Sequence, residues 1–222
     1  MQALKNINEA IAFFESKAHL LDAQTQADIK SGKKEFQLAD FYIRKKLSGG
    51  SGIIDLIKET DSLSPSVTNI DKAKLYAGQH LLLMAVGLAY GFSAAAVTVD
   101  TIDYSSNIYK INDVEADAGA GVVAGVGVPV RYIPTSIVNS EFEITAGGNR
   151  IYKSRTKKFF SEAISGYGIE ANDENCVLLQ APKIIAAEKL IKMQMEFGAN
   201  SPALVNNHFI EVRLIGIYTA DR

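Results

Sequence analysis

The chain has 222 residues, of which 47% are hydrophobic, enough to fill the core of one large or two small domains. Its formal net charge is −2 and its pI is about 6.0, which excludes a globally basic surface of the kind that binds nucleic acid or an anionic membrane. The single cysteine, Cys176, excludes an internal disulfide, and acidic residues within residues 1–17 argue against a secretory signal peptide.

Residues 3–30 are predicted to form a helix, because their apolar side chains recur every three or four positions and make one stripe. The stripe could pack against the protein's own body or against a helix of another subunit, and the sequence leaves both interpretations open. Its members are Leu4, Ile7, Ile11, Phe14, Ala18 and Leu21.

Two further short helices are predicted over residues 36–46 and 53–57, with a flexible Gly/Ser joint at residues 48–52. We therefore interpret residues 1–65 as a helical N-terminal arm or subdomain. The cations of this arm form a basic cluster, which is either a solvated face or a phosphate-binding site. The cluster consists of Lys33, Lys34, Arg44, Lys45 and Lys46.

Residues 75–99 contain no Asp, Glu, Lys or Arg, and their length and apolar content raise the question of a membrane span. Gln79 and His80 near the start and several small residues argue against it. The pattern favours a buried strand or helix over residues 81–90, a turn near Gly91 and a further strand. Association with a membrane through residues 75–99 stays an alternative.

The chain after residue 97 is a succession of short apolar or alternating segments between turns, which is typical of a sandwich rather than of βαβ units. The turn at residues 146–149 predicts a hairpin, because Gly and Asn tolerate positive φ. We expect a mainly β fold with a helical N-terminal arm, in which residues 66–222 form an antiparallel jelly-roll-like β-sandwich. The expected strands include residues 98–104, 108–111, 137–145, 151–153 and 177–180, and Pro182 is expected to break the last of them.

The clearest strand patterns lie near the C-terminus. Apolar and polar residues alternate over residues 191–197 and again over residues 209–218, which predicts two half-buried strands. We expect them to be the last pair of the sandwich. Their inward faces are predicted to carry Ile191, Met193, Met195, Phe197, Ile210, Val212 and Leu214.

Two motifs could carry ligand chemistry. Residues 119–124 match the Gly-x-Gly-x-x-Gly/Ala fingerprint of dinucleotide-binding folds, and Glu141 lies downstream. The preceding residues are polar rather than a buried strand, so we expect a loop or a closely packed strand instead. The alternating carboxylates Asp113, Glu115 and Asp117 could bind Ca²⁺, but the Gly and Glu of a calcium loop are replaced by alanines, which favours a solvated acidic loop.

Catalytic candidates are few. His19, His80 and His208 lie far apart in the sequence and have no metal-ligand spacing. Cys176 with His208 could form a nucleophilic pair, although a buried inert thiol is the favoured interpretation. We expect a protein that is not an enzyme, with no catalytic, cofactor-binding or metal-binding residue and no cofactor.

A resemblance to a known family rests on residues 134–137 running into residues 139–142, on residues 181–184, and on the closing residues 209–218. With these features, residues 97–222 resemble the small jelly-roll coat proteins of tailless bacteriophages. The resemblance implies a self-assembling structural subunit of a virion, put together in the host cytoplasm. The alternative is a carbohydrate-binding or adhesion module, because aromatic residues could line a sugar groove.

The partners that the resemblance implies are copies of the chain itself and other virion proteins. Sequence-specific binding of nucleic acid is not expected, and a membrane is the less favoured partner. An arm joined by a Gly/Ser hinge to a β body suits assembly, because the hinge would let identical chains meet at several angles.

Overall fold

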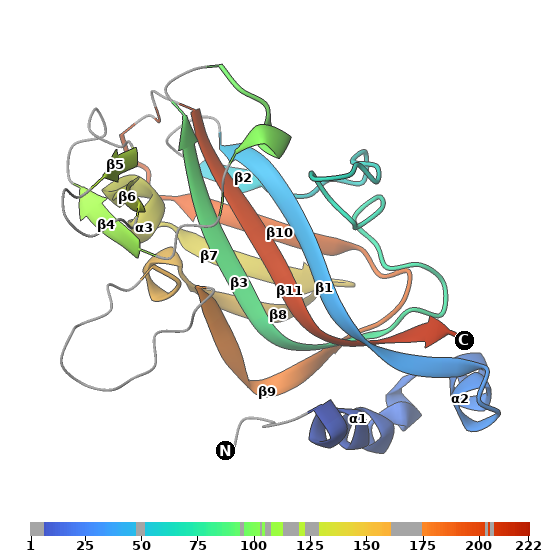
Figure 1. Cartoon of the computed structure of the whole chain (residues 1–222). Helices are drawn as coiled ribbons and strands as arrows, with labels where there is room; N and C mark the ends of the chain where they lie inside the picture. Colours follow the sequence, from blue (N-terminus) through green and yellow to red (C-terminus); the bar gives the residue numbers. More distant parts are fainter. Residues whose placement is uncertain are drawn as a thin grey trace.

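The computed structural model describes residues 7–47, 52–93, 96–102, 104, 108–112, 120–122, 129–160, 175–202, 204 and 207–222. In these residues two four-stranded antiparallel sheets pack face to face, which confirms a mainly β sandwich with N-terminal helices (Figure 1). Sheet A has the spatial order β1 (Lys34–Leu47), β11 (Asn207–Asp221), β3 (Leu81–Ser93), β9 (Cys176–Ile185). Sheet B has the order β2 (Gly52–Asp55), β10 (Ile191–Phe197), β7 (Glu141–Ala146), β8 (Asn149–Arg155).

The strands of the sandwich pair in a nested way. The first strand, β1, pairs with the last, β11, and the second, β2, pairs with the last but one, β10. In the same manner β3 pairs with β9, and β7 with its successor β8. The chain is thus folded like one long hairpin whose paired arms are wrapped into two sheets.

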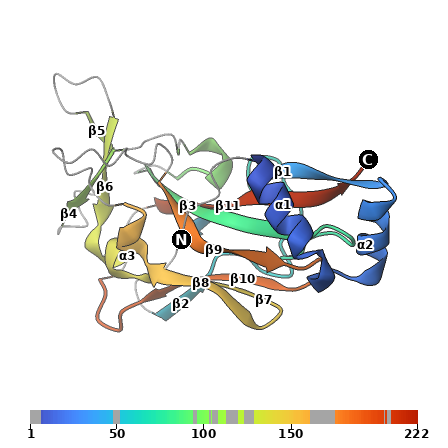
Figure 2. The ribbon, with the colours of Figure 1, turned by 90° about the horizontal axis from the view of Figure 1, so that it is seen from below.

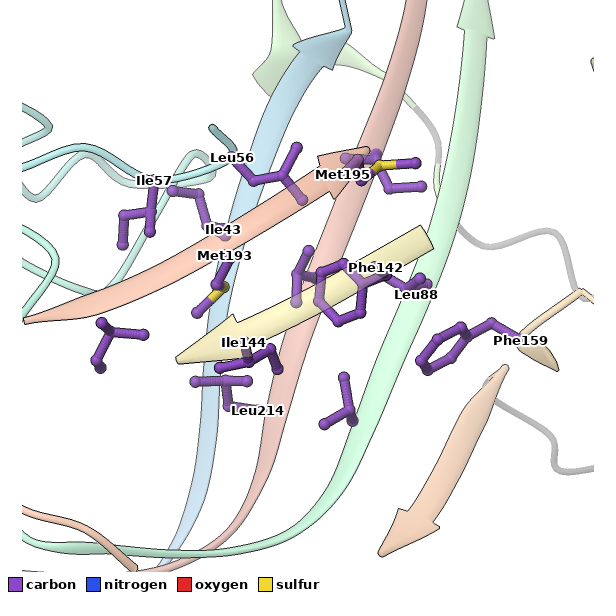
Figure 3. Close-up of a cluster of buried hydrophobic side chains, with 14 of the residues drawn as sticks. Ile43, Leu56, Ile57, Leu88, Phe142, Ile144, Phe159, Met193, Met195 and Leu214 are labelled. Atoms are coloured by element: carbon purple, nitrogen blue, oxygen red, sulfur yellow. The ribbon is translucent and has the colours of Figure 1, made fainter. Parts of the chain in front are cut away.

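The inner faces of the two sheets supply one hydrophobic core, in which side chains from both sheets meet (Figure 3). The residues labelled there are each 4% exposed or less, so each large side chain contributes about 1.5–3 kcal/mol through burial. They include Ile43, Leu88 and Leu214 from sheet A, and Phe142, Ile144, Met193 and Met195 from sheet B.

The two C-terminal strands are confirmed with the predicted inward faces. Along β10 the burial alternates strictly, with Ile191 and Phe197 buried and Lys192 exposed. The expectation that these strands form a pair is wrong, because β10 lies in sheet B and β11 in sheet A. Period two fixes which face of a strand is buried, but it does not specify the neighbouring strand.

The N-terminal helix is shorter and more broken than predicted. Helix α1 spans Ile7–Ser16, a 3₁₀ turn η1 spans Ala18–Leu20, and α2 spans Ala23–Lys30. The break falls where Asp22 caps a new helix, because its carboxylate accepts a hydrogen bond from the backbone N–H of Thr25.

The helices predicted at residues 36–46 and 53–57 are wrong. Residues 34–47 form the long strand β1, which pairs with β11 along its whole length, and residues 52–55 form β2. Both strands belong to the sandwich, so the helical part of the predicted 1–65 arm ends at Lys30. Of the Gly/Ser joint, residues 48–51 lie outside the described residues.

The apolar stretch at residues 75–99 supplies β3, which lies between β11 and β9 and is buried over most of its length. No helix among the described residues is long and apolar enough to cross a membrane. The strand expected at residues 98–104 is wrong, since Val99–Thr101 form a 3₁₀ turn, η2. Ile102 and Tyr104 of this segment lie against Gly91 on the outer face of sheet A.

A small third sheet lies between β3 and β7 in the chain. It contains β4 (Ile108–Asn112), β6 (Pro129–Pro134) and β5 (Ala120–Val122), with β6 in the centre. The short helix α3 (Thr135–Asn139) then leads into β7, so Ile137 is helical and not part of a strand as predicted. Its N-terminal Pro134 and the buried Ile137 suit a helical turn packed on the sandwich.

The hairpin at residues 146–149 is confirmed. Gly147 and Gly148 have φ of 55° and 83° and connect β7 to β8 with the two-residue turn that favours these angles. Strand β9 continues through Pro182 instead of ending there. Its pairing with β3 is nevertheless interrupted near Pro182 by a register shift, which an edge strand tolerates.

Candidate functional site

The N-terminal helices cover one end of the outer face of sheet A (Figure 2). Phe14 is fully buried there, and its ring centroid lies 5.3 Å from that of Phe36 on β1. Leu82 of β3 and Ile217 of β11 lie in the same cluster. The members Ile11, Phe14, Ala18 and Leu21 of the apolar stripe therefore pack on the chain's own body. Leu4 and the side chain of Ile7 are not among the parts that the structure describes.

A polar cluster fixes α2 to the same end of sheet A. The carboxylate of Asp22 accepts hydrogen bonds from the Thr25 backbone and hydroxyl, both 2.8 Å long. The Nδ1 atom of buried His80 accepts a 3.3 Å hydrogen bond from the Ala187 backbone, so its Nε2 carries the proton and donates to Asp22 over 2.8 Å. Because the Thr25 hydroxyl donates to Asp22, His80 does not activate it as a nucleophile, and the cluster is a structural anchor.

The hydrogen bonds from Thr25 lower the pKa of Asp22 from 3.8 to about 2, with a smaller contribution from His80. The folded-state pKa lies below the unfolded value. The stabilisation from this anchor is therefore complete above pH 3.8 and is lost as the pH falls through about 2. The anchor holds α2 in place at neutral and mildly acidic pH.

His208 lies in the core at the opposite end of sheet A. Its Nδ1 atom is 2.8 Å from the hydroxyl of Tyr90, and its ring packs 5.4 Å from that of Phe92. Among the described residues, its Nε2 atom is buried without a hydrogen-bond partner. Burial lowers the pKa of His208 from 6.5 to about 4, so the ring is neutral at pH 7.

This buried ring gives a testable pH dependence. The unfolded chain binds a proton at His208 below pH 6.5 and the folded chain only below about 4, so folding stability should fall as the pH is lowered through this window. His208→Phe should remove that part of the pH dependence. Urea melts of both proteins at pH 7, 6, 5 and 4 measure the difference, and parallel curves would contradict it.

The basic cluster proposed from the sequence is divided in the structure. Lys34 pairs with Asp221 at the far end of β1, about 33 Å along the strand from Arg44. Arg44, Lys45 and Lys46 line a groove of about 420 Å³ together with Thr60, Asp61, Ser62 and Thr68. Each of these three cations already has a partner. Arg44 pairs with Glu211 at 2.5 Å and Lys45 with Asp61 at 3.2 Å, and Lys46 donates a 2.5 Å hydrogen bond to the side-chain oxygen of Asn207. Much of the charge that would attract a phosphate is thus compensated.

A second pocket, of about 290 Å³, lies beside the loop that follows residue 70. Asp71, Lys72, Tyr76 and Glu188 line it, and Tyr76 is 49% exposed. The backbones of Lys72, Ala73 and Glu188 all have positive φ, which is strained for residues with a Cβ. An exposed ring with charged groups around it offers both stacking and hydrogen bonding to a small polar ligand.

The remaining candidates do not form a site. Cys176 pairs with Gly87 and His208 with Phe92, five positions further along β3, so they are too far apart to be a nucleophilic pair. The carboxylate of Glu141 is held on β7 by Lys153 at 2.6 Å. The carboxylates of residues 113–117 lie outside the described residues, as do residues 119, 123 and 124 of the 119–124 motif, whose residues 120–122 form β5. No metal-binding group of side chains occurs within the described residues.

Comparisons with known proteins identify no relative. No family model matches the chain, and neither the curated proteins nor the solved structures contain a significant match. The fold and its surfaces therefore carry the functional argument alone.

Two features escaped the sequence analysis. Asp22 three positions before Thr25 is a recognisable capping signal, although its partner His80 lies 58 positions away. The edge strands of the two sheets were not predicted either, because the sequence indicates which segments are strands but not which strands lie at the edge of a sheet. These edges are the surfaces on which a second chain could dock.

Proposed function

We propose that the protein is a structural subunit that assembles with copies of itself into the coat of a bacteriophage virion. The observation that carries the proposal is the nested pairing of β1 with β11, β2 with β10, β3 with β9 and β7 with β8. We infer that this is jelly-roll connectivity, since a jelly roll is an antiparallel hairpin wrapped into two sheets, and viral coat proteins are prominent among the proteins built this way.

The surface of sheet B supports a structural role. Its outer face is a ladder of ion pairs, with Lys153 bridging Glu141 at 2.6 Å and Glu143 at 3.7 Å, and Arg150 pairing with Glu143 at 2.7 Å. Such a face has its charges internally balanced and leaves little net field to attract a charged ligand. The helices on sheet A likewise cover a face that would otherwise be apolar.

The test is the assembly state of the full chain. Purified protein at micromolar concentration should elute as symmetric oligomers or larger particles in size exclusion with light scattering. Negative-stain electron microscopy should then show particles of regular size. A strictly monomeric protein across a hundredfold range of concentration would contradict the proposal.

The pocket beside Tyr76 supports a second candidate, a carbohydrate-binding module. Its exposed ring could stack on a sugar, and Asp71 and Glu188 could accept hydrogen bonds from hydroxyl groups. In that case a glycan array should retain the protein, and Tyr76→Ala should abolish retention without lowering the melting temperature. Tyr42→Ala, which removes a ring outside this pocket, is the control.

A further inference from the structure

The pocket beside Tyr76 differs from the larger groove on sheet A, because its charged side chains are unpaired. Two cations and two carboxylates line it, namely Lys72, Lys74, Asp71 and Glu188. Within the described part of the chain, none of these four side chains makes an ion pair or a hydrogen bond. All three cations of the larger groove, by contrast, have partners. The charges around the smaller pocket are therefore available to a ligand.

One wall of the pocket is a tight turn with a fixed backbone. Lys72 and Ala73 have positive φ, 46° and 57°, and the Lys74 N–H donates to the Asp71 carbonyl over 2.9 Å. Turns with two such angles normally take Gly or Asn at these positions. The turn is fastened to the start of β10, because the Ile191 N–H donates to the Ala73 carbonyl over 2.8 Å. The two lysine side chains thus start from a backbone that is held in place.

The opposite wall carries Glu188, and the backbone joins it to the first wall. Glu188 also has a positive φ, 58°, and its N–H donates to the Leu75 carbonyl over 3.1 Å. Backbone strain of this kind persists only where the surrounding structure holds it. The pocket is therefore formed before a ligand arrives, so that binding does not have to order the two loops.

The lining residues specify the chemistry of a complementary ligand. Carboxylates only accept hydrogen bonds and lysines only donate them, so the ligand must offer both hydroxyl donors and an anionic acceptor. The ring of Tyr76, 49% exposed, favours a ligand ring with an apolar face. A volume of about 290 Å³ lies at the lower end of the range of about 300–1,000 Å³ for small-molecule sites, which suits a single ring.

Two simpler ligands fit less well. Inorganic phosphate has no apolar face for Tyr76, and its double negative charge would be repelled by Asp71 and Glu188. A neutral sugar would stack on the ring but would leave Lys72 and Lys74 without a counter-charge.

We propose that this pocket binds a sugar unit that carries a carboxylate, such as a uronic acid or a sialic acid at the end of a glycan. Its carboxylate pairs with Lys72 and Lys74, and its hydroxyl groups donate to Asp71 and Glu188. The apolar face of the sugar ring packs on Tyr76. This inference rests on the carbohydrate-binding candidate above and specifies the class of its ligand.

Two pairs of ligands that differ in acidity test the inference by isothermal titration calorimetry. They are methyl β-glucuronide with methyl β-glucoside, and sialyllactose with lactose. In at least one pair the acid should bind about tenfold more tightly than the neutral sugar, because two exposed charge contacts together contribute on that order. Raising the NaCl concentration from about 0.1 M to about 1 M should remove the preference, because salt screens exposed charges.

A double variant connects the preference to the two lysines. Lys72→Gln with Lys74→Gln should lower the affinity for the acid to that for the neutral sugar and leave the latter unchanged. The matched control is Lys157→Gln with Lys158→Gln, which removes the same charge from the exposed 3₁₀ turn η4 (Thr156–Lys158) outside the pocket. Circular dichroism melts verify folding, and the salt dependence of the parent decides the question if the first variant does not fold.

The outcomes separate the ligand class from carbohydrate binding itself. Equal affinities for acid and neutral sugar in both pairs would mean that the ligand class is wrong, while carbohydrate binding stands. Equal weakening by the two double variants also overturns the inference, because the effect would then come from net charge rather than from this pocket. A protein that binds none of the four ligands overturns both the inference and the carbohydrate-binding candidate.

Discussion

Phe197→Ala and Leu214→Ala are each expected to lower the free energy of unfolding by roughly 2–5 kcal/mol. Phe197 closes the buried face of β10 at 3% exposure, and Leu214 lies on the inner face of β11 at 0%. Both side chains belong to the core that joins the two sheets, so each truncation removes apolar contacts and leaves a cavity that the sheets cannot fully close.

Lys192→Ala is the matched control for this prediction, because Lys192 lies on the same strand and points outward. Its free energy of unfolding should change by less than about 0.5 kcal/mol. Urea melts of the three variants and the parent measure the differences. Equal midpoints for Phe197→Ala and the parent would mean that the inner face of β10 is not part of the core.

The strands that the sequence predicted correctly are those in which local pattern and tertiary environment agree. Apolar and polar residues alternate without exception along β10, so its pattern fits a strand and not a helix. Strand β1 is different, because its buried residues Ala39, Ile43 and Leu47 recur every four positions. This spacing fits one face of a helix, and it also fits every second residue on one face of a strand. Its pairing with β11, more than 150 positions away in the sequence, makes this segment a strand. The local sequence does not indicate that partner.

The candidate surfaces were still less predictable. The pocket beside Tyr76 combines residues 71–77 with Glu188, which only the fold brings together. Leu178 on β9 is 56% exposed, while the equally apolar Leu82 on β3 is fully buried because it packs in the cluster formed by the N-terminal helices. Hydrophobicity alone does not show which outward-facing residues of a sheet a helix will cover.

Gly216→Ala is expected to have an effect as large as that of the core truncations, but for the opposite reason. Gly216 lies where the pairing of β11 with β3 shifts register, and the two backbones approach closely there. A Cβ at this position would lie in steric conflict with the backbone carbonyl of Leu82. A carbonyl in a paired central strand cannot turn away as a flexible side chain can, so the sheet itself must shift.

We expect Gly216→Ala to cost about 3 kcal/mol or more, the upper end of the range for overpacked positions. Gly198→Ala is the control, because a Cβ there would meet only the Ser201 hydroxyl at 3.4 Å. Thermal melts followed by circular dichroism should show a large fall in melting temperature for Gly216→Ala and almost none for Gly198→Ala. The close approach of the two backbones at Gly216 would be wrong if the two variants melted together, since an added Cβ would then not meet the carbonyl of Leu82.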